Sequence, residues 1–230
     1  KFYEKYLSKE TEHFAISPEH AAGFYTFLQK IKEIFSHKIL FLKGQVAGPI
    51  TFGLTVTDEK KQPILYHDSL RDTIIKTLAL KARWQEEQFK KINPQLKTIM
   101  FFDEPYLRAY GSAYISLNRQ DAIAYLNDCF SEVEGLKGVH VCANTDWALL
   151  METNVDIISF DAYDYTESLA LYPKELERFL ERGGLLAWGI VPAAYPNPEQ
   201  VAEENLTSLL DRFEEQLSLV VKKGFNKHKL

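Results

Sequence analysis

The chain has 230 residues, of which 46% are hydrophobic and 13% aromatic, and its formal net charge is -5. This composition supports a packed core and excludes a disordered chain. No lysine- or arginine-rich block occurs, so we expect no nucleic-acid partner. The longest apolar runs are shorter than the roughly 20 residues of a membrane span, so we expect no membrane partner. With two cysteines and no secretory signal pattern, the chain is expected to be cytoplasmic.

Apolar runs typical of strands alternate with amphipathic patterns typical of helices. The strand runs are nearly continuous in apolar residues, as in parallel strands that are covered on both faces. This alternation predicts a single parallel α/β domain over residues 1–230. In chain order we predict helix 18–35, strand 38–46, helix 68–91, strand 97–105, helix 118–135, strand 138–144, strand 156–163, helix 172–184, strand 185–191 and helix 198–222.

Polar side chains gather at the carboxyl ends of the predicted strands. A TIM (β/α)8 barrel carries its chemistry at this face, drawn from several strands, whereas an open doubly wound sheet would be complete with the strands visible here. No Gly-x-Gly-x-x-Gly or Walker-type turn follows any strand, which disfavours a nucleotide site. We therefore predict a TIM barrel whose first and last strands are missing from this chain. The polar residues are Gln45, Asp103, Glu104, His140, Cys142, Asp161 and Asp164.

One predicted strand carries a histidine and a cysteine two positions apart, His140 and Cys142. Side chains alternate along a strand, so positions i and i+2 point the same way. An imidazole and a thiolate so placed can bind one zinc ion if another strand end supplies a further ligand. The structural alternative is a buried cysteine beside a core histidine, because free cysteine is among the most buried residue types.

Four short segments, taken in order, resemble a known superfamily. They are Gly48-Pro49-x-Thr51, Asp103-Glu104-Pro105, His140-x-Cys142 and the "DIISFD" run that ends at Asp161. Over about residues 38–192 this set is similar to the catalytic domain of cobalamin-independent methionine synthase. The same superfamily includes corrinoid-dependent zinc thiol methyltransferases and uroporphyrinogen decarboxylase. The resemblance implies a TIM barrel.

The resemblance also implies roles for these residues. His140 and Cys142 match zinc ligands, and Asp161 stands where methionine synthases carry a zinc-binding glutamate, so Asp161 is a candidate both for the metal and for catalysis. Asp103 matches an acidic residue that helps hold the thiol substrate and is a second catalytic candidate. The implied substrate-binding residues are Gly48, Thr51, Asp103 and Glu104.

The implied reaction is zinc-dependent methyl transfer to a small thiol of the homocysteine type, as in methionine biosynthesis. Zinc binding deprotonates a thiol, whose pKa is otherwise near 8.5, while the sulfur stays nucleophilic. The methyl donor would be a folate or a corrinoid protein. Gly189-Ile190-Val191 occupies the place of a histidine that can serve as the acid in folate-dependent synthases, so a relative that uses another donor, such as a corrinoid protein, fits equally well.

A second departure from the family concerns the zinc ligands. The family uses another cysteine on the last barrel strand, and none follows residue 142. Cys129 lies in a helical pattern and is expected to be a buried structural thiol. Two alternatives therefore stay open. One is a decarboxylase of the uroporphyrinogen type, which would hold substrate carboxylates with arginines; Arg71 and Arg108 are the only arginines near the matched segments. The other is a degenerate barrel, without catalysis, that binds a corrinoid or another carrier.

Overall fold

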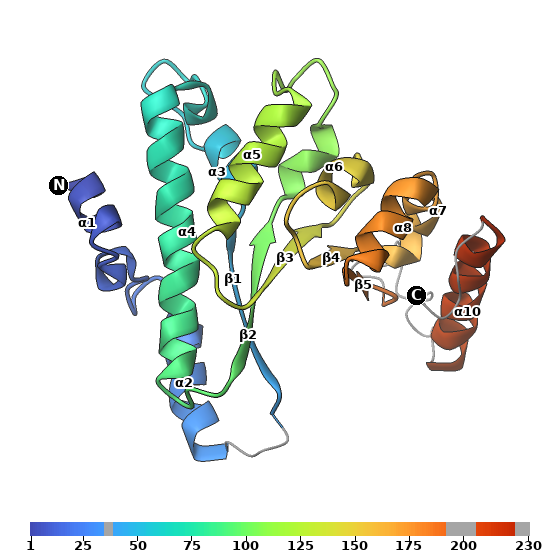
Figure 1. Ribbon diagram of the computed structural model, residues 1–230, viewed down its shortest axis with the longest axis horizontal. Helices are drawn as coiled ribbons and strands as arrows, with labels where there is room; N and C mark the ends of the chain where they lie inside the picture. The colour runs from blue at the N-terminus through green and yellow to red at the C-terminus, as the bar shows by residue number, and fades with distance from the viewer. Residues whose placement is uncertain (35–38, 192–205, 224–230) are drawn as a thin grey trace.

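The computed structural model describes residues 1–34, 39–191 and 206–223. Its centre is a sheet of five parallel strands in the order β1-β2-β3-β4-β5, so each strand pairs with the next one in the sequence. Figure 1 shows the strands extending from β1 and β2 beside α4 to β5 near α7 and α8, with α10 at the far end. The strands are β1 Phe41–Ala47, β2 Lys97–Asp103, β3 Leu136–Val141, β4 Ile157–Phe160 and β5 Leu185–Trp188.

All five predicted strand runs contain a strand, and the five predicted helical patterns contain a helix. The predicted parallel α/β class is therefore confirmed. Residues 198–205 of the last predicted helix lie outside the described residues. The helices that correspond to the predictions are α2 Ala22–Ile34, α4 Asp68–Lys90, α5 Arg119–Phe130, α8 Pro173–Glu181 and α10 Leu206–Lys222.

Several short elements follow strands or turns and were not predicted. The strand expected over 156–163 ends at Phe160, because α7 begins at Ala162 with Asp161 as its N-cap residue. The strand expected over 138–144 likewise ends at Val141, one residue before Cys142. The additional elements are α1 Phe2–Leu7, η1 Thr11–Phe14, α3 Pro49–Thr55, η2 Ile64–Tyr66, η3 Pro105–Ala109, α6 Trp147–Met151 and α7 Ala162–Leu169.

The sheet formed by the described residues is open, with β1 at one edge and β5 at the other. A closed eight-stranded barrel is therefore not confirmed and stays a prediction. No helix within the described ranges has the length and apolar character needed to cross a bilayer.

The two faces of the sheet differ in burial. On β1, exposed and buried residues alternate strictly, as expected when only one face is packed. The covered face packs against helices, α4 lying against β1 and β2. The opposite face includes Lys43, Gln45 and Ala47 of β1 together with the residues in register with them on the other strands. We call it the open face. The covered face includes Leu42, Val46, Met100, Phe102, Val139, Ile158 and Phe160, all buried.

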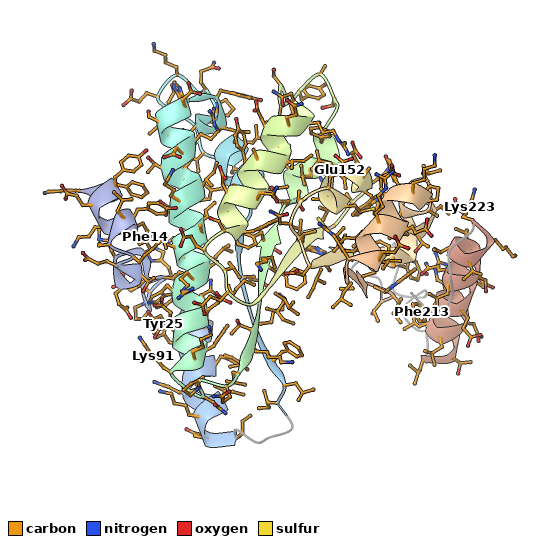
Figure 2. The ribbon with its side chains drawn as sticks, viewed as in Figure 1. Phe14, Tyr25, Lys91, Glu152, Phe213 and Lys223 are labelled. Carbon is orange, nitrogen blue, oxygen red and sulfur yellow. The ribbon has the colours of Figure 1, made fainter. Side chains whose placement is uncertain are left out.

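Elements from the two ends of the described chain complete the packing. The Tyr25 ring of α2 lies 6.2 Å from the Trp84 ring of α4, and Lys91 Nζ donates to Glu12 Oε1 at 3.0 Å. Figure 2 shows Phe14, Tyr25 and Lys91 along the same side of α4. At the other end, the Phe213 ring of α10 lies 5.4 Å from Trp188 of β5. The amino-terminal segment thus packs on α4, and α10 packs at the β5 edge.

The free edge of β1 is capped by a side chain. Gln85 of α4 is buried, its Nε2 donates to Gln45 O at 2.9 Å, and its Oε1 accepts from Gln45 N at 3.3 Å. The side-chain amide therefore bonds to both backbone groups of one edge residue, as the peptide of a neighbouring strand would. Gly44 makes room for it, because a Cβ there would lie 2.7 Å from Gln85 Oε1.

We predict that Gln85→Ala speeds hydrogen exchange of the Gln45 amide, because the variant lacks the group that accepts its hydrogen bond. Exchange measured by NMR at single residues checks this. Gln88→Ala, on the same helix but bonded to Glu12 and Lys91, should leave the Gln45 rate unchanged. Equal Gln45 rates in the wild type and Gln85→Ala would contradict the capping role.

Candidate active site at the carboxyl edge of the sheet

A row of side chains crosses the open face at the carboxyl ends of the strands. The register pairs Ala47 with Asp103, Asp103 with His140, and His140 with Ser159. Partners in a parallel sheet project from the same face, so Asp103, His140 and Ser159 lie side by side. Two of the predicted site residues, Asp103 and His140, are therefore brought together.

His140 is half-buried, and its ring has a defined partner. Its Nδ1 lies 3.1 Å from Ser159 Oγ, and its backbone carbonyl accepts from Glu104 N at 2.9 Å. The hydroxyl can donate to or accept from Nδ1, according to the tautomer of the ring. With Nδ1 engaged, Nε2 is the ring nitrogen left for a ligand, a metal or a proton.

The two predicted catalytic carboxylates flank the strand that carries His140. Burial raises the pKa of Asp103, and the nearby charges of His140 and Lys43 oppose this. Burial also raises the pKa of Asp161, with the neighbouring Asp164 carboxylate acting in the same direction and His140 opposing it. His140 thus interacts electrostatically with a carboxylate on each side. Aspartates with raised pKa values hold a proton at higher pH than exposed ones, which suits them to acid-base work.

Cys142 lies just beyond the end of β3 and is exposed, unlike Cys129, which is fully buried. The expectation that both His140 and Cys142 belong to one regular strand is therefore wrong, because pairing with β4 stops at Val141. Among the described residues, no group of three or more His, Cys, Asp and Glu side chains is placed to hold a metal ion. Zinc binding by His140, Cys142 and Asp161 stays a prediction.

Cys129 is a structural thiol, as predicted. Its Sγ lies 3.7 Å from Ile75 O in the core between α4 and α5, and burial raises the pKa of the thiol well above its ordinary value. A neutral buried thiol is a poor metal ligand and nucleophile. The decarboxylase alternative required arginines that are free to hold substrate carboxylates. The Arg71 guanidinium instead bonds to Asp68 Oδ1 at 2.7 Å and to Leu65 O at 3.1 Å.

Glu104 joins the loops that follow β1 and β2. Its side chain is 0% exposed, Oε1 accepts from Ile50 N at 2.9 Å, and Oε2 accepts from Thr51 N at 2.7 Å. These amides belong to the first turn of α3, where backbone donors have no partner within the helix. In return, Thr51 Oγ1 accepts from Tyr106 N at 3.2 Å. We call this reciprocal set of hydrogen bonds the Glu104 clamp.

Gly48 makes the Glu104 clamp possible by leaving space for it. A Cβ at this position would lie 2.2 Å from the carboxyl carbon of Glu104. The backbone of Gly48 has φ -72° and ψ 155°, which any residue can adopt, so the glycine serves space and not conformation. These contacts give Gly48, Thr51 and Glu104 a structural role, while their contact with a substrate stays a prediction.

Two residues of this edge were not singled out from the sequence. Ser159 holds the His140 ring, and it lies two positions before Asp161, where strand alternation would have put it on the same face. Lys43 lies on the open face of β1, and its charge acts on Asp103. Alternation from Gln45, which was noted as a polar strand-end residue, would have identified it.

Comparison with known proteins gives one likeness in fold. No protein-family model and no curated protein matches the chain. Among solved structures, the chain is similar to a B12-independent methionine synthase from Shewanella sp. W3-18-1 in complex with selenomethionine, with a TM-score of 0.54 and 19% sequence identity. The match covers 84% of this chain and 55% of the synthase chain, so the chain spans little more than half of that protein. At this identity, the likeness shows the fold alone.

We predict that Gly48→Ala destabilises the protein by about 1–3 kcal/mol, because the added methyl overlaps the Glu104 carboxyl group. Urea unfolding with Gly23→Ala as the control checks this. A Cβ at Gly23, in α2, meets no atom within 4 Å, so that change should stabilise the helix by about 0.5–1 kcal/mol. A Gly48→Ala variant as stable as the wild type would contradict the close packing of the clamp.

The Glu104 clamp also predicts a pH dependence. Burial, opposed by the hydrogen bonds from Ile50 and Thr51, raises the pKa of Glu104 from 4.5 to about 7. The folded chain therefore binds a proton more tightly than the unfolded chain, and the resulting stability is fully present below pH 4.5 and is lost as the pH rises through about 7. The full effect is about 3 kcal/mol.

Glu104→Gln removes this titration, so its unfolding free energy should change less than that of the wild type across the same window. Denaturant unfolding at a series of pH values measures the two slopes. Glu33→Gln, at an exposed position of α2, should keep the wild-type slope. A Glu104→Gln slope equal to that of the wild type would refute the assignment.

Proposed function

We propose that the protein is a methyltransferase that methylates a small thiol of the homocysteine type at the carboxyl edge of its sheet. One observation carries the proposal: His140 stands on the open face between Asp103 and Asp161, in a fold similar to that of a methionine synthase. In parallel α/β proteins the carboxyl ends of the strands are where ligands bind. The proposal includes closure of the sheet into a barrel, which requires a further strand to replace the Gln85 side chain at the β1 edge.

We further propose that zinc is held by His140, Cys142 and Asp161. The donor types fit zinc, because imidazole nitrogen, thiolate sulfur and carboxylate oxygen are its usual ligands. The three side chains are not placed as a metal-binding group in this structure, so the proposal requires them to move together when the metal binds. The contact between His140 Nδ1 and Ser159 Oγ supports the fit, since metal-binding histidines commonly use their other nitrogen to bond a polar partner. A bound zinc ion would supply a Lewis acid that keeps a thiol substrate deprotonated and nucleophilic at neutral pH.

The remaining steps are proposed for the side chains of the chain itself. Asp103 lies next to His140 in the register and is partly buried, so it can hold a polar group of the substrate or a proton near the reacting sulfur. Ser159 positions the His140 ring, and the Glu104 clamp fixes the loops after β1 and β2 that border the site. Fixed positions of this kind lower the entropic cost of bringing the thiol to its methyl donor.

We propose a corrinoid protein rather than a folate as the methyl donor. Gly189, Ile190 and Val191 follow β5 in the sequence, and none of these three residues has a side chain that can donate a proton to a leaving folate. The Gly189 backbone is used instead to join β4 and α7, its N–H donating to Phe160 O and its carbonyl accepting from Tyr163 N. A corrinoid that leaves in its reduced form needs no proton from this position.

The zinc proposal predicts that the purified protein binds about one zinc per chain and that Cys142→Ser loses most of it, because a hydroxyl is a much poorer zinc ligand than a thiolate. Metal analysis after dialysis checks this. Cys129→Ser is the matched control, since it also removes one thiol, but from the core. It should keep its zinc and lose stability.

Methyl transfer is tested on the same proteins with homocysteine as acceptor and methylcobalamin or methyltetrahydrofolate as donor. The proposal expects activity with methylcobalamin in the wild type and in any folded Cys129→Ser, and its loss in Cys142→Ser. A wild-type protein that binds no zinc and has no activity would contradict the proposal and would favour the alternative of a non-catalytic barrel that binds a corrinoid or another carrier.

A further inference from the structure

Lys43 has no part in the proposed metal set, yet it lies on the same open face as His140. In the register, Lys43 pairs with Ile99, Gln45 with Phe101, and Ala47 with Asp103. Lys43 is therefore two rows below the row that holds Asp103 and His140. The charge of Lys43 acts on the Asp103 carboxylate and lowers its pKa, against the effect of burial.

The Lys43 side chain is directed along β1 toward the row that holds Asp103 and His140. Its Nζ donates to Gln45 Oε1 at 2.7 Å and lies 4.8 Å from the centre of the Phe101 ring. Gln45 and Phe101 are in register with each other, two residues closer to the carboxyl edge than Lys43. The remaining rise from their row to that of Asp103 is two residues, roughly 7 Å.

The Phe101 ring under this ammonium group is itself held in place. Phe101 pairs with Gly138 of β3, and a Cβ at Gly138 would lie 2.6 Å from the ring. The glycine therefore lets the Phe101 ring lie over β3 at position 138, two residues before His140. A buried aromatic face beneath a lysine holds its ammonium group and excludes water from one side of it.

The two groups in direct contact with the Lys43 ammonium are an amide oxygen and an aromatic ring, and the Asp103 carboxylate interacts with it electrostatically without a direct contact. An ammonium group so placed gains most from an anionic partner, because charge-assisted hydrogen bonds are about twice as strong as neutral ones. The rise of roughly 7 Å from the row of Gln45 and Phe101 to the row of Asp103 and His140 suits a small ligand with a reactive group at one end and an anionic group a few bonds away.

We propose that Lys43 is a specificity-determining residue that binds the carboxylate of a small substrate whose thiol lies in the row of Asp103 and His140. The assignment of the thiol end rests on the proposed function. The anionic end rests on the placement of Lys43, Gln45 and Phe101 alone. Lys43 would thereby select thiols that carry a carboxylate over neutral thiols of the same size.

The test compares mercaptopropionate, a thiol with a carboxylate, with mercaptoethanol, a neutral thiol. Binding to the full chain is followed by NMR titration of backbone amides on β1, β2 and β3. The wild type should bind mercaptopropionate about tenfold more tightly, the factor expected from one charge-assisted hydrogen bond. Lys43→Met should lose this preference while it keeps the methylene packing on Phe101.

Lys97→Met is the matched control. Lys97 is also on the open face, with Nζ 5.7 Å from the Phe41 ring, but its row is six residues before that of Asp103. This variant should keep the wild-type preference. Equal binding of the two thiols by the wild type, or an unchanged preference in Lys43→Met, would overturn the proposal.

The design separates this proposal from the proposed function. Methionine-type activity can fail, through loss of zinc or of a donor, while selective binding of the carboxylate still depends on Lys43. Propionate, which has the carboxylate without the thiol, reports on the anionic end alone. It should compete with mercaptopropionate in the wild type and in Lys97→Met, and lack of competition in the wild type would overturn the assignment of a carboxylate site.

Discussion

The arrangement of the candidate site depends on one buried carboxylate. Glu104 follows β2, yet it accepts hydrogen bonds from the first turn of α3, which follows β1. A single side chain thus sets the spacing of two strand-end loops, and the return bond from Tyr106 to Thr51 closes the set. Asp103, the residue just before Glu104, is thereby fixed beside His140. A charge in the core costs free energy, and here backbone N–H groups that would otherwise be unpaired reduce that cost without cancelling it, since the pKa of Glu104 is still raised to about 7.

The difference between the two faces of the sheet separates stability from chemistry. The covered face carries the large apolar residues that pack against α4 and its neighbours. The open face carries a lysine in one row, a glutamine in the next, and an aspartate and a histidine together in the third. Strand alternation assigns these two tasks to alternate residues of the same segments. The side chain of one residue can therefore change the site while the residues next to it in the sequence keep the core.

The sequence was sufficient for the strands and for part of the site, and the reasons are physical. Continuous apolar runs identified all five strands, and strand ends in a parallel sheet meet at one edge, which brought Asp103 and His140 together. The short helices α3 and α7 were missed, because segments such as "PITFGLT" are rich in β-formers and are held by a glutamate more than fifty residues away. The ends of β3 and β4 were predicted too late, because Cys142 and Ala162 continue the apolar pattern beyond the last paired residues, Val141 and Phe160. Local patterns carry no signal for such distant partners.

The order of the strands in the sheet has a consequence for how the chain can assemble. Each described strand from β2 to β5 pairs with the strand that precedes it in the sequence, so its first partner has already been synthesised when it emerges. During synthesis the amino-terminal units emerge first, so every new strand-and-helix unit meets a sheet edge that already exists. Pairings between adjacent units keep the loops that must close short compared with the chain. Growth of this kind proceeds in one direction, from the edge that Gln85 seals toward β5.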